Sequence, residues 1–221
     1  MKKMMTQKTA QPSPAIRGLY ALTPDSLNTE DLLLQVRQAL KGGVQVLQYR
    51  NKIADSALRL AQAQALRTLT QMFDVTFIVN DDAQLAAAVD ADGVHLGKAD
   101  GGVKSARALL GSNKLIGVSC YNQLQLAYEA VAEGADYVAF GAFYTSTVKP
   151  DAAVATTDLL SKARAEISVP IVAIGGITAD NGAVLVEAGA DALAVISAVF
   201  DAADIQLAAK NLSKLFRKQS A

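Results

Sequence analysis

The sequence predicts an α/β protein made of a single (β/α)8 barrel, also called a TIM barrel. Eight short runs rich in Val, Ile, Leu and aromatic residues alternate with longer Ala-, Leu- and Gln-rich stretches of helical period, which is the pattern of parallel strands joined by helices. No obvious linker divides the 221 residues, a length near the short end of the range for this fold. Together these observations indicate one barrel.

The eight strand candidates can be placed in order along the chain. They lie near residues 17–23, 44–50, 75–80, 93–97, 114–119, 136–141, 170–176 and 191–197. Helical stretches follow them, for example residues 29–43, 56–72, 123–135 and 183–190. The segments EGADY and AGADA each end a helix with glycine and enter a strand through aspartate, as a repeating unit would. An open doubly wound sheet is the alternative, but LTPDSLN after the first strand lacks the glycine-rich dinucleotide fingerprint.

Composition excludes several classes of function. The 21 basic and 21 acidic residues leave no net charge that would attract nucleic acid or a membrane. One cysteine and one histidine supply neither an internal disulfide nor an ordinary zinc site, which favours a reducing cytoplasm. No run approaches the roughly 20 apolar residues of a membrane span. We expect residues 1–15 to be a flexible tail and residues 16–221 to be the catalytic barrel, with a homo-oligomer allowed but not required.

Cations stand at two of the predicted strand ends, which is where active sites lie in this fold. The second strand ends in Gln48, Arg50 and Lys52, and Lys149 follows the sixth. Residues two apart on a strand share a face, and clustered cations are stabilised by an anion such as phosphate or pyrophosphate between them. The alternative is that Arg50 and Lys52 are solvated surface charges.

Acidic residues follow the third and fourth strands. Asn80 and Asp81 close the third strand, and Asp100 comes after the fourth. Two carboxylates from adjacent strand ends suit Mg²⁺, because substrate phosphate and water can complete its octahedron of oxygens. Helix capping is the alternative, and we assign it to Asp82, which precedes the helical segment AQLAAAV.

The last two strands end in IGGIT and VIS. Barrels often bind a phosphate between the loops after these strands, and Gly176 faces Ile196 and Ser197 there. The alternative for Gly175 and Gly176 is a strained turn. A second anion site on the same rim indicates a reaction that joins two phosphorylated small molecules and releases pyrophosphate.

These residues, in this order, resemble the thiamine phosphate synthase family from about residue 17 to about residue 200. The family's Gln-x-Arg-x-Lys strand end is matched by QYRNK at 48–52, its Asn-Asp pair by residues 80–81, and its GxHxGQxD segment by GVHLGKAD at 93–100. Its serine, its lysine, its GIGGI segment and its Ile-Ser pair fall on Ser119, Lys149, AIGGI at 173–177 and residues 196–197. Seven matches in register at seven strand ends are specific.

The resemblance implies a Mg²⁺-dependent transfer of the 4-amino-2-methylpyrimidinylmethyl group from its diphosphate to a thiazole phosphate, carboxylated or plain, giving thiamine phosphate and pyrophosphate. It places Mg²⁺ on Asp81 and Asp100. The implied diphosphate ligands are Arg50, Lys52, Asn80 and Lys149. Those of the pyrimidine are Gln48 and Ser119. Those near the thiazole phosphate are Ser146, Val148, Gly176, Ile196 and Ser197. The implied catalytic residues are Arg50, Lys52, Ser119 and Lys149.

The chain departs from the family pattern after the sixth strand. There GAFYTSTVK carries Ala142 for a proline, Ser146 for one threonine and Val148 for another. Two rival functions are a thiazole tautomerase of the same superfamily, which uses a histidine near the position of Tyr121, and a non-catalytic barrel that senses thiamine precursors. A dissociative transfer needs no protein base, so we expect His95 to be an inward-facing barrel residue.

The segment 145–158 is longer than the two to six residues common in such loops and is built from small and polar residues around Lys149. It predicts a lid that closes over the diphosphate and excludes water. The alternative is an ordinary surface loop.

Overall fold

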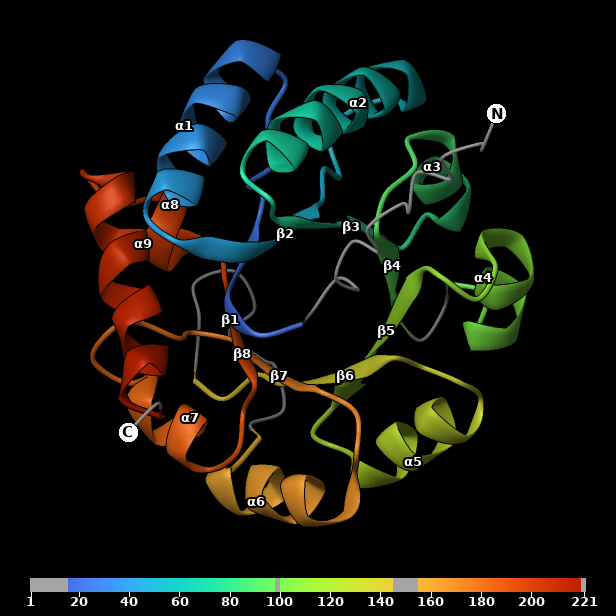
Figure 1. The fold of residues 1–221 in the computed structure, drawn as a ribbon, viewed down its shortest axis with the longest axis vertical. Coiled ribbons are helices and arrows are strands. Elements are labelled where there is room, and N and C mark those ends of the chain that lie inside the picture. The colour runs from blue at the N-terminus through green and yellow to red at the C-terminus, as the bar shows by residue number, and fades with distance from the viewer. Residues whose placement is uncertain (1–15, 98–99, 145–154, 220–221) are drawn as a thin grey trace, which may run out of the picture.

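Eight parallel strands form a closed barrel in the order β1 to β8, which confirms the predicted fold. The computed structural model describes residues 16–97, 100–144 and 155–219. Helices surround the ring of strands, as the view down the barrel shows (Figure 1). β1 pairs with β2 on one side and with β8 on the other, so the sheet has no free edge. The predicted flexible tail and residues 145–154 of the predicted lid lie outside the described residues.

The strands and helices alternate along the described chain. The strands are β1 Gly18–Leu22, β2 Val44–Tyr49, β3 Thr76–Asn80, β4 Gly93–Leu96, β5 Leu115–Tyr121, β6 Tyr137–Phe140, β7 Ile171–Ile174 and β8 Ala192–Val195. The helices are α1 Thr29–Lys41, α2 Ser56–Met72, α3 Ala83–Ala88, α4 Val103–Leu110, α5 Leu124–Ala132, α6 Thr157–Glu166, α7 Ala183–Glu187, α8 Ser197–Phe200, α9 Ile205–Ser213 and the 3₁₀ helix η1 Lys214–Gln219. Predicted and observed strand bounds differ by no more than two residues.

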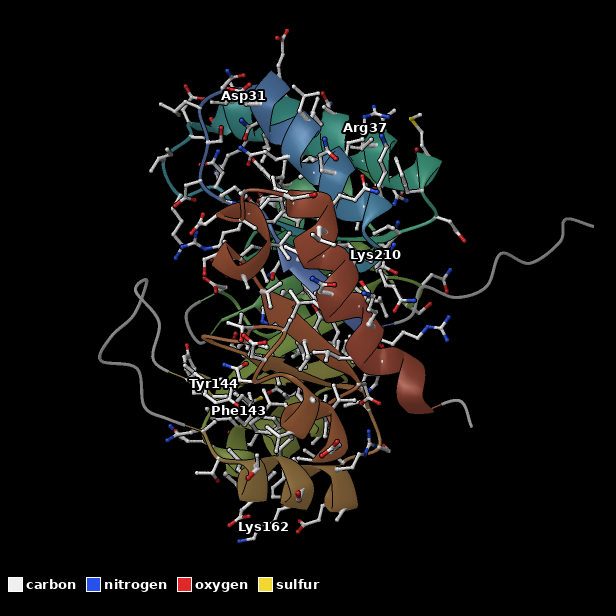
Figure 2. All side chains as sticks on the ribbon, turned by 90° about the vertical axis from the view of Figure 1, so that its left-hand side faces the viewer. Asp31, Arg37, Phe143, Tyr144, Lys162 and Lys210 are labelled. Carbon is white, nitrogen blue, oxygen red and sulfur yellow. The ribbon has the colours of Figure 1, made fainter. Side chains whose placement is uncertain are left out.

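The core has two layers because successive strand side chains point to opposite faces. One cluster fills the barrel interior and includes Tyr20, Val46, Ile78, Tyr137 and Val172. The larger cluster packs between the outer face of the strands and the helices. In the side view, the labelled charged residues of α1 and α6 lie on opposite outer sides of the barrel (Figure 2). Positions two residues beyond the interior cluster reach the carboxyl-end rim, where the site is built.

The three helices before β4, β6 and β8 end in the same turn, which extends the repeat seen in the sequence. The helix α2, before β3, also ends in this way, since the N–H of Val75 donates to the carbonyl of Thr70 and Asp74 has a φ of 54°. The backbone N–H of Ala91, Ala135 and Ala190 donates to the carbonyl of the residue five positions earlier, closing α3, α5 and α7. The residue before each alanine has a positive φ: Gly134 at 95°, Gly189 at 111° and Asp90 at 51°. This is the Schellman motif, which favours glycine and tolerates a short polar side chain. The third copy, DADG, was missed in the sequence because aspartate replaces the glycine.

Each of the turns before β4, β6 and β8 is followed by an aspartate that makes the same set of hydrogen-bonded contacts, called here the clamp. Asp92, Asp136 and Asp191 precede β4, β6 and β8. One carboxylate oxygen of each aspartate accepts two hydrogen bonds. The first comes from a backbone N–H at the start of the preceding strand, β3, β5 or β7. The second comes from an arginine on the helix that leads into that strand, α2, α4 or α6. The arginines are Arg67, Arg107 and Arg164. The clamps therefore tie two neighbouring strands and a helix together at the amino end of the barrel, away from the site.

Asp136→Asn should lower the free energy of unfolding by about 1–2 kcal/mol, because it weakens charged hydrogen bonds to Arg107 and to the backbone of Ile116. Asp90→Asn is the matched control. Asp90 pairs with Lys114 but is mostly exposed, so its loss should change stability by less than about 0.5 kcal/mol. Urea unfolding of both variants measures the difference, and equal midpoints would remove the stabilising role of the clamp.

Candidate active site

The predicted site residues within the described chain lie at the carboxyl ends of the strands. They lie within the last three residues of a strand or within four residues after it, at β2, β3, β4, β5, β7 and β8. These residues are Gln48, Arg50, Lys52, Asn80, Asp81, Asp100, Ser119, Gly176, Ile196 and Ser197. In the side view, Phe143 and Tyr144 mark the carboxyl end of β6 (Figure 2). Ser146, Val148 and Lys149 lie outside the described residues, so their positions stay predictions.

Gln48 and Asn80 meet on top of the apolar barrel interior. They lie two residues beyond Val46 and Ile78, which belong to the interior cluster, so strand alternation turns them inward. Gln48 is only 3% exposed, and its Nε2 donates to Oδ1 of Asn80 at 3.0 Å. This hydrogen bond gives Asn80 a fixed orientation at the point where β3 leads into the acidic residues.

Arg50 is held by the loop that follows β1. The Asp25 carboxylate accepts hydrogen bonds from Nη1 of Arg50 at 3.2 Å and from the backbone N–H of Lys52 at 2.8 Å. The Thr23 hydroxyl accepts from the backbone N–H of Arg50 and donates to its carbonyl. The end of β2 is thus oriented before any anion binds, by an acidic residue that lies outside the QYRNK motif.

Asp81 turns out of β3 toward Asp100. Its φ of 63° is in the left-handed region, and its backbone N–H donates to the carbonyl of His95 at 2.8 Å. Oδ2 of Asp100 accepts from the backbone N–H of Gly97 at 2.8 Å, which fixes the second carboxylate after β4. Both residues line an open hollow of about 420 Å³ together with Asp82, Ala83, Gln84, Ser105, Ala106 and Leu109.

The Asp81 carboxyl is perturbed by its surroundings. Burial and the neighbouring Asp100 raise the pKa of the Asp81 carboxyl to about 6, against smaller opposing effects of the Lys52 charge and a hydrogen bond from Asn80. A cation between two such carboxylates would relieve their repulsion. Asp82, in contrast, caps α3 through a hydrogen bond from the backbone N–H of Leu85 at 2.8 Å, which confirms its predicted capping role.

The donor set suits a sparsely bound hard cation. No group of three or more His, Cys, Asp or Glu side chains that could hold a metal ion occurs in the part of the chain that the structure describes. Two half-exposed oxygen donors beside an open hollow fit Mg²⁺, which keeps waters and takes substrate phosphate oxygens. They do not fit a closed zinc site, which needs four nitrogen or sulfur ligands.

A chain of hydrogen bonds runs through the barrel interior to Ser119. The Tyr20 hydroxyl on β1 contacts the Tyr137 hydroxyl on β6 at 3.0 Å, and the latter contacts Nδ1 of His95 at 3.1 Å. Nε2 of His95 lies 2.9 Å from Oγ of Ser119. Burial lowers the pKa of the His95 imidazole to about 4 and raises the pKa of both phenols. The predicted inward-facing position of His95 is therefore observed, and the ring is neutral at pH 7.

The loop after β7 is held tightly against the loop after β6. Gly175 has a φ of 105°, and a Cβ on it would lie 2.4 Å from Cβ of Ala142. The Asn181 side chain donates to the carbonyl of Gly176 at 3.1 Å and accepts from the backbone N–H of Thr178 at 2.8 Å. This folds the IGGIT segment into a compact turn beside Ile196 and Ser197. The close approach requires glycine at 175, so a structural role for that residue stands beside any phosphate contact.

Several residues of this rim were not found from the sequence. Asp25 is separated from Arg50 along the chain and meets it only because β1 and β2 are neighbours. Tyr137 was interpreted as part of an apolar strand. It lies on β6 and contacts His95 on β4, two strands away in the barrel. Asn181 lay in a turn without a recognised motif. The one signal for Asp25 in the sequence was its position in the loop shortly after the first strand, where site residues are expected.

A barrel whose carboxyl-end rim carries cations, paired carboxylates and a glycine turn is typical of enzymes that act on phosphorylated small molecules. A sequence profile of the thiamine monophosphate synthase family matches residues 19–199. The thiamine-phosphate synthase of Thiobacillus denitrificans is 54% identical over 199 residues, covering 90% of this chain and 94% of that protein. That of Methylobacillus flagellatus is 54% identical over 203 residues, covering 92% and 97%. The thiamine phosphate pyrophosphorylase of Pyrococcus furiosus superposes with a TM-score of 0.84 at 37% identity, covering 92% and 97% of the two chains.

The chain belongs to the thiamine monophosphate synthase family. It is a transferase that joins the pyrimidine and thiazole halves of thiamine phosphate, as the sequence predicted. The tautomerase and sensor alternatives are therefore set aside. None of the helices in the described residues has the length and apolar character needed to cross a membrane.

His95→Gln should remove an acid sensitivity of the fold. Below pH 6.5 the histidine of the unfolded chain takes up a proton, whereas the folded one stays neutral to about pH 4. The unfolded state then binds more protons, so stability falls as the pH drops through this window, by up to about 3 kcal/mol. Urea unfolding of the wild type and of His95→Gln across pH 7 to 4.5 measures this effect, because the carboxylates titrate in both proteins. Parallel stability curves would contradict it.

Proposed function

We propose that Asp81 and Asp100 hold Mg²⁺ against the diphosphate of the pyrimidine substrate, and that the neighbouring cations and amide bind the diphosphate oxygens. The observation that carries this proposal is the half-buried Asp81 carboxylate, which lies beside Asp100 and within reach of the Lys52 charge. The proposed diphosphate ligands are Arg50, Lys52, Asn80 and Lys149, the last of which lies outside the described residues. When bound, Mg²⁺ would neutralise charge on the departing pyrophosphate.

Arg50 and Lys52 stabilise the leaving group. The Asp25 carboxylate holds the guanidinium of Arg50 and the backbone of Lys52 in place, so little side-chain entropy is lost when the diphosphate binds. Departure of pyrophosphate leaves a pyrimidine cation, which the thiazole nitrogen attacks. Stabilisation of the leaving anion by preset charges is then the main contribution of the protein.

No general base is required in this scheme, and the surroundings of His95 support that. Its two ring nitrogens are occupied by Tyr137 and Ser119. Burial keeps the imidazole neutral, with a pKa of about 4. His95 is therefore poorly placed to exchange a proton with the substrate, and Ser119 is the group of this chain that faces the site.

The two organic halves are assigned to opposite parts of the rim. We assign the pyrimidine to Gln48 and Ser119, which face inward above the interior cluster. Ser119 is also proposed as catalytic, with Arg50, Lys52 and Lys149. The thiazole phosphate is assigned to the side of the rim formed after β6, β7 and β8, with the ligands Ser146, Val148, Gly176, Ile196 and Ser197. We place the enzyme in the cytoplasm, and its substrates are small phosphorylated molecules.

A single-turnover assay with both substrates and Mg²⁺ tests this function. The expected result is thiamine phosphate and pyrophosphate in equal amounts. Tautomerisation of the thiazole without coupling, or binding without any product, would contradict the assignment. Leaving out the thiazole phosphate is the control, and it should yield only slow hydrolysis of the pyrimidine diphosphate.

Asp81→Asn and Asp100→Asn should each lower turnover by orders of magnitude and raise the Mg²⁺ concentration needed for half-maximal rate, since each removes one of two charged ligands. High Mg²⁺ should restore part of the activity. Asp82→Asn is the matched control, because asparagine also caps a helix and Asp82 has no assigned ligand role. Turnover against Mg²⁺ concentration measures all three variants. Unchanged metal dependence in the Asp81 and Asp100 variants would remove these residues as metal ligands.

A further inference from the structure

The hydrogen-bond chain that ends at Ser119 has a direction that can be worked out from its donors. It joins four groups in sequence: the Tyr20 hydroxyl, the Tyr137 hydroxyl, the His95 ring and the Ser119 hydroxyl. A neutral imidazole donates from one nitrogen and accepts at the other. The bonds at the two ring nitrogens therefore run the same way, either toward Ser119 or away from it.

In the direction away from Ser119, one buried hydrogen has no acceptor. Nδ1 of His95 would donate to Tyr137, which would donate to Tyr20. The Tyr20 hydroxyl would then need an acceptor of its own, and if Tyr20 instead donated to Tyr137, the hydrogen of the Tyr137 hydroxyl would lack one. Tyr20 is 1% exposed, and among the described residues the Tyr137 hydroxyl is its one hydrogen-bond partner. A doubly protonated His95 would also leave a buried phenol hydrogen without an acceptor, because Nδ1 would again donate. A buried donor without a partner is strongly disfavoured.

In the direction toward Ser119, every buried hydrogen has an acceptor. Tyr20 donates to Tyr137, Tyr137 donates to Nδ1 of His95, and Nε2 of His95 donates to Oγ of Ser119. The hydrogen of Ser119 is the last one in the chain. Among the described residues it has no acceptor in the protein, and it lies at the carboxyl end of β5, on the rim.

We infer that His95 carries its proton on Nε2, and that Tyr137 and His95 act as positioning residues that present the Ser119 hydroxyl to the pyrimidine diphosphate as a hydrogen-bond donor. The inference rests on the proposed placement of that substrate at Ser119. It implies that the substrate atom facing Ser119 is an acceptor, such as an unprotonated ring nitrogen or a diphosphate oxygen.

The packing of Tyr137 shows that the fold makes room for this chain. Tyr137 is the register partner of Gly117 on β5. A Cβ on Gly117 would lie 2.0 Å from Cζ of Tyr137. The phenol ring therefore lies directly across the position of a missing side chain, from which its hydroxyl reaches His95. The ring of His95 lies 5.5 Å from that of Tyr137 and bridges the remaining distance to Ser119.

The tautomer can be observed directly, because the chain contains a single histidine. In protein labelled with ¹⁵N-histidine, the one-histidine NMR spectrum at pH 7 should show a protonated Nε2 and an unprotonated Nδ1. A protonated Nδ1, a doubly protonated ring, or rapid averaging of both tautomers would each overturn the inference. This readout requires no substrate, so its failure is distinguishable from failure of the coupling assay.

Two variants that delete opposite ends of one hydrogen bond form a matched pair. Tyr137→Phe removes the hydrogen bond to Nδ1 while Nε2 keeps its bond to Ser119, so the signal of the unprotonated Nδ1 should shift and Nε2 should stay protonated. Tyr20→Phe removes only the far end of the chain and leaves Tyr137 donating to His95, so the signals should keep the wild-type pattern. Equal changes in the two variants, or none in Tyr137→Phe, would contradict the assigned direction.

A double-mutant cycle connects the chain to the reaction. Tyr137→Phe should lower kcat/KM for the pyrimidine diphosphate about 3- to 10-fold, the value of one hydrogen bond. In a Ser119→Ala background the same substitution should have no further effect, because the hydroxyl that it positions is absent. An undiminished loss in that background would show that Tyr137 acts only through the stability of the fold.

Discussion

Closure of eight short parallel strands into a ring is the constraint on which the rest of the structure depends. Because β1 has to pair with β8 as well as with β2, all inward side chains share one interior and all carboxyl ends meet on one rim. Tyr20 and Tyr137 are far apart in the sequence and on strands across the barrel, yet their hydroxyls are in contact. The direct pairing of β1 with β2 brings Asp25, after β1, to Arg50, after β2.

The interior of this barrel combines apolar packing with one polar path. Val46, Ile78 and Val172 fill it in the usual way, whereas the phenols and the imidazole satisfy one another. Buried polar groups of this kind stabilise a fold only when each has a partner. Here these side chains lie directly below the carboxyl-end rim. The Ser119 hydroxyl, which we assign to the substrate, is therefore held by atoms packed in the core.

Acidic side chains shape the electrostatic environment of the rim as much as the basic ones do. The chain has no net charge, and the only acidic residue contacting the cation motif directly among those described, Asp25, orients it. Burial and the neighbouring Asp100 raise the pKa of the Asp81 carboxyl. Opposite charges thus lie on neighbouring loops, where an anion and a cation that bind together can be accommodated.

Part of this protein was determined by the sequence alone. Alternating periods of two and 3.6 residues predicted all eight strands and the closed barrel, since burial on both faces of a parallel strand leaves a strong apolar pattern. The positions of Gln48, Asp81 and Ser119 at strand ends followed from the same pattern and from the family resemblance. Only the tertiary structure decided which groups touch. The contacts of Arg50 with Asp25, of His95 with Tyr137, and of Asp92 with Arg67 join residues distant in sequence, and no local propensity or spacing encodes such pairs; they exist because strand register and ring closure bring the residues together.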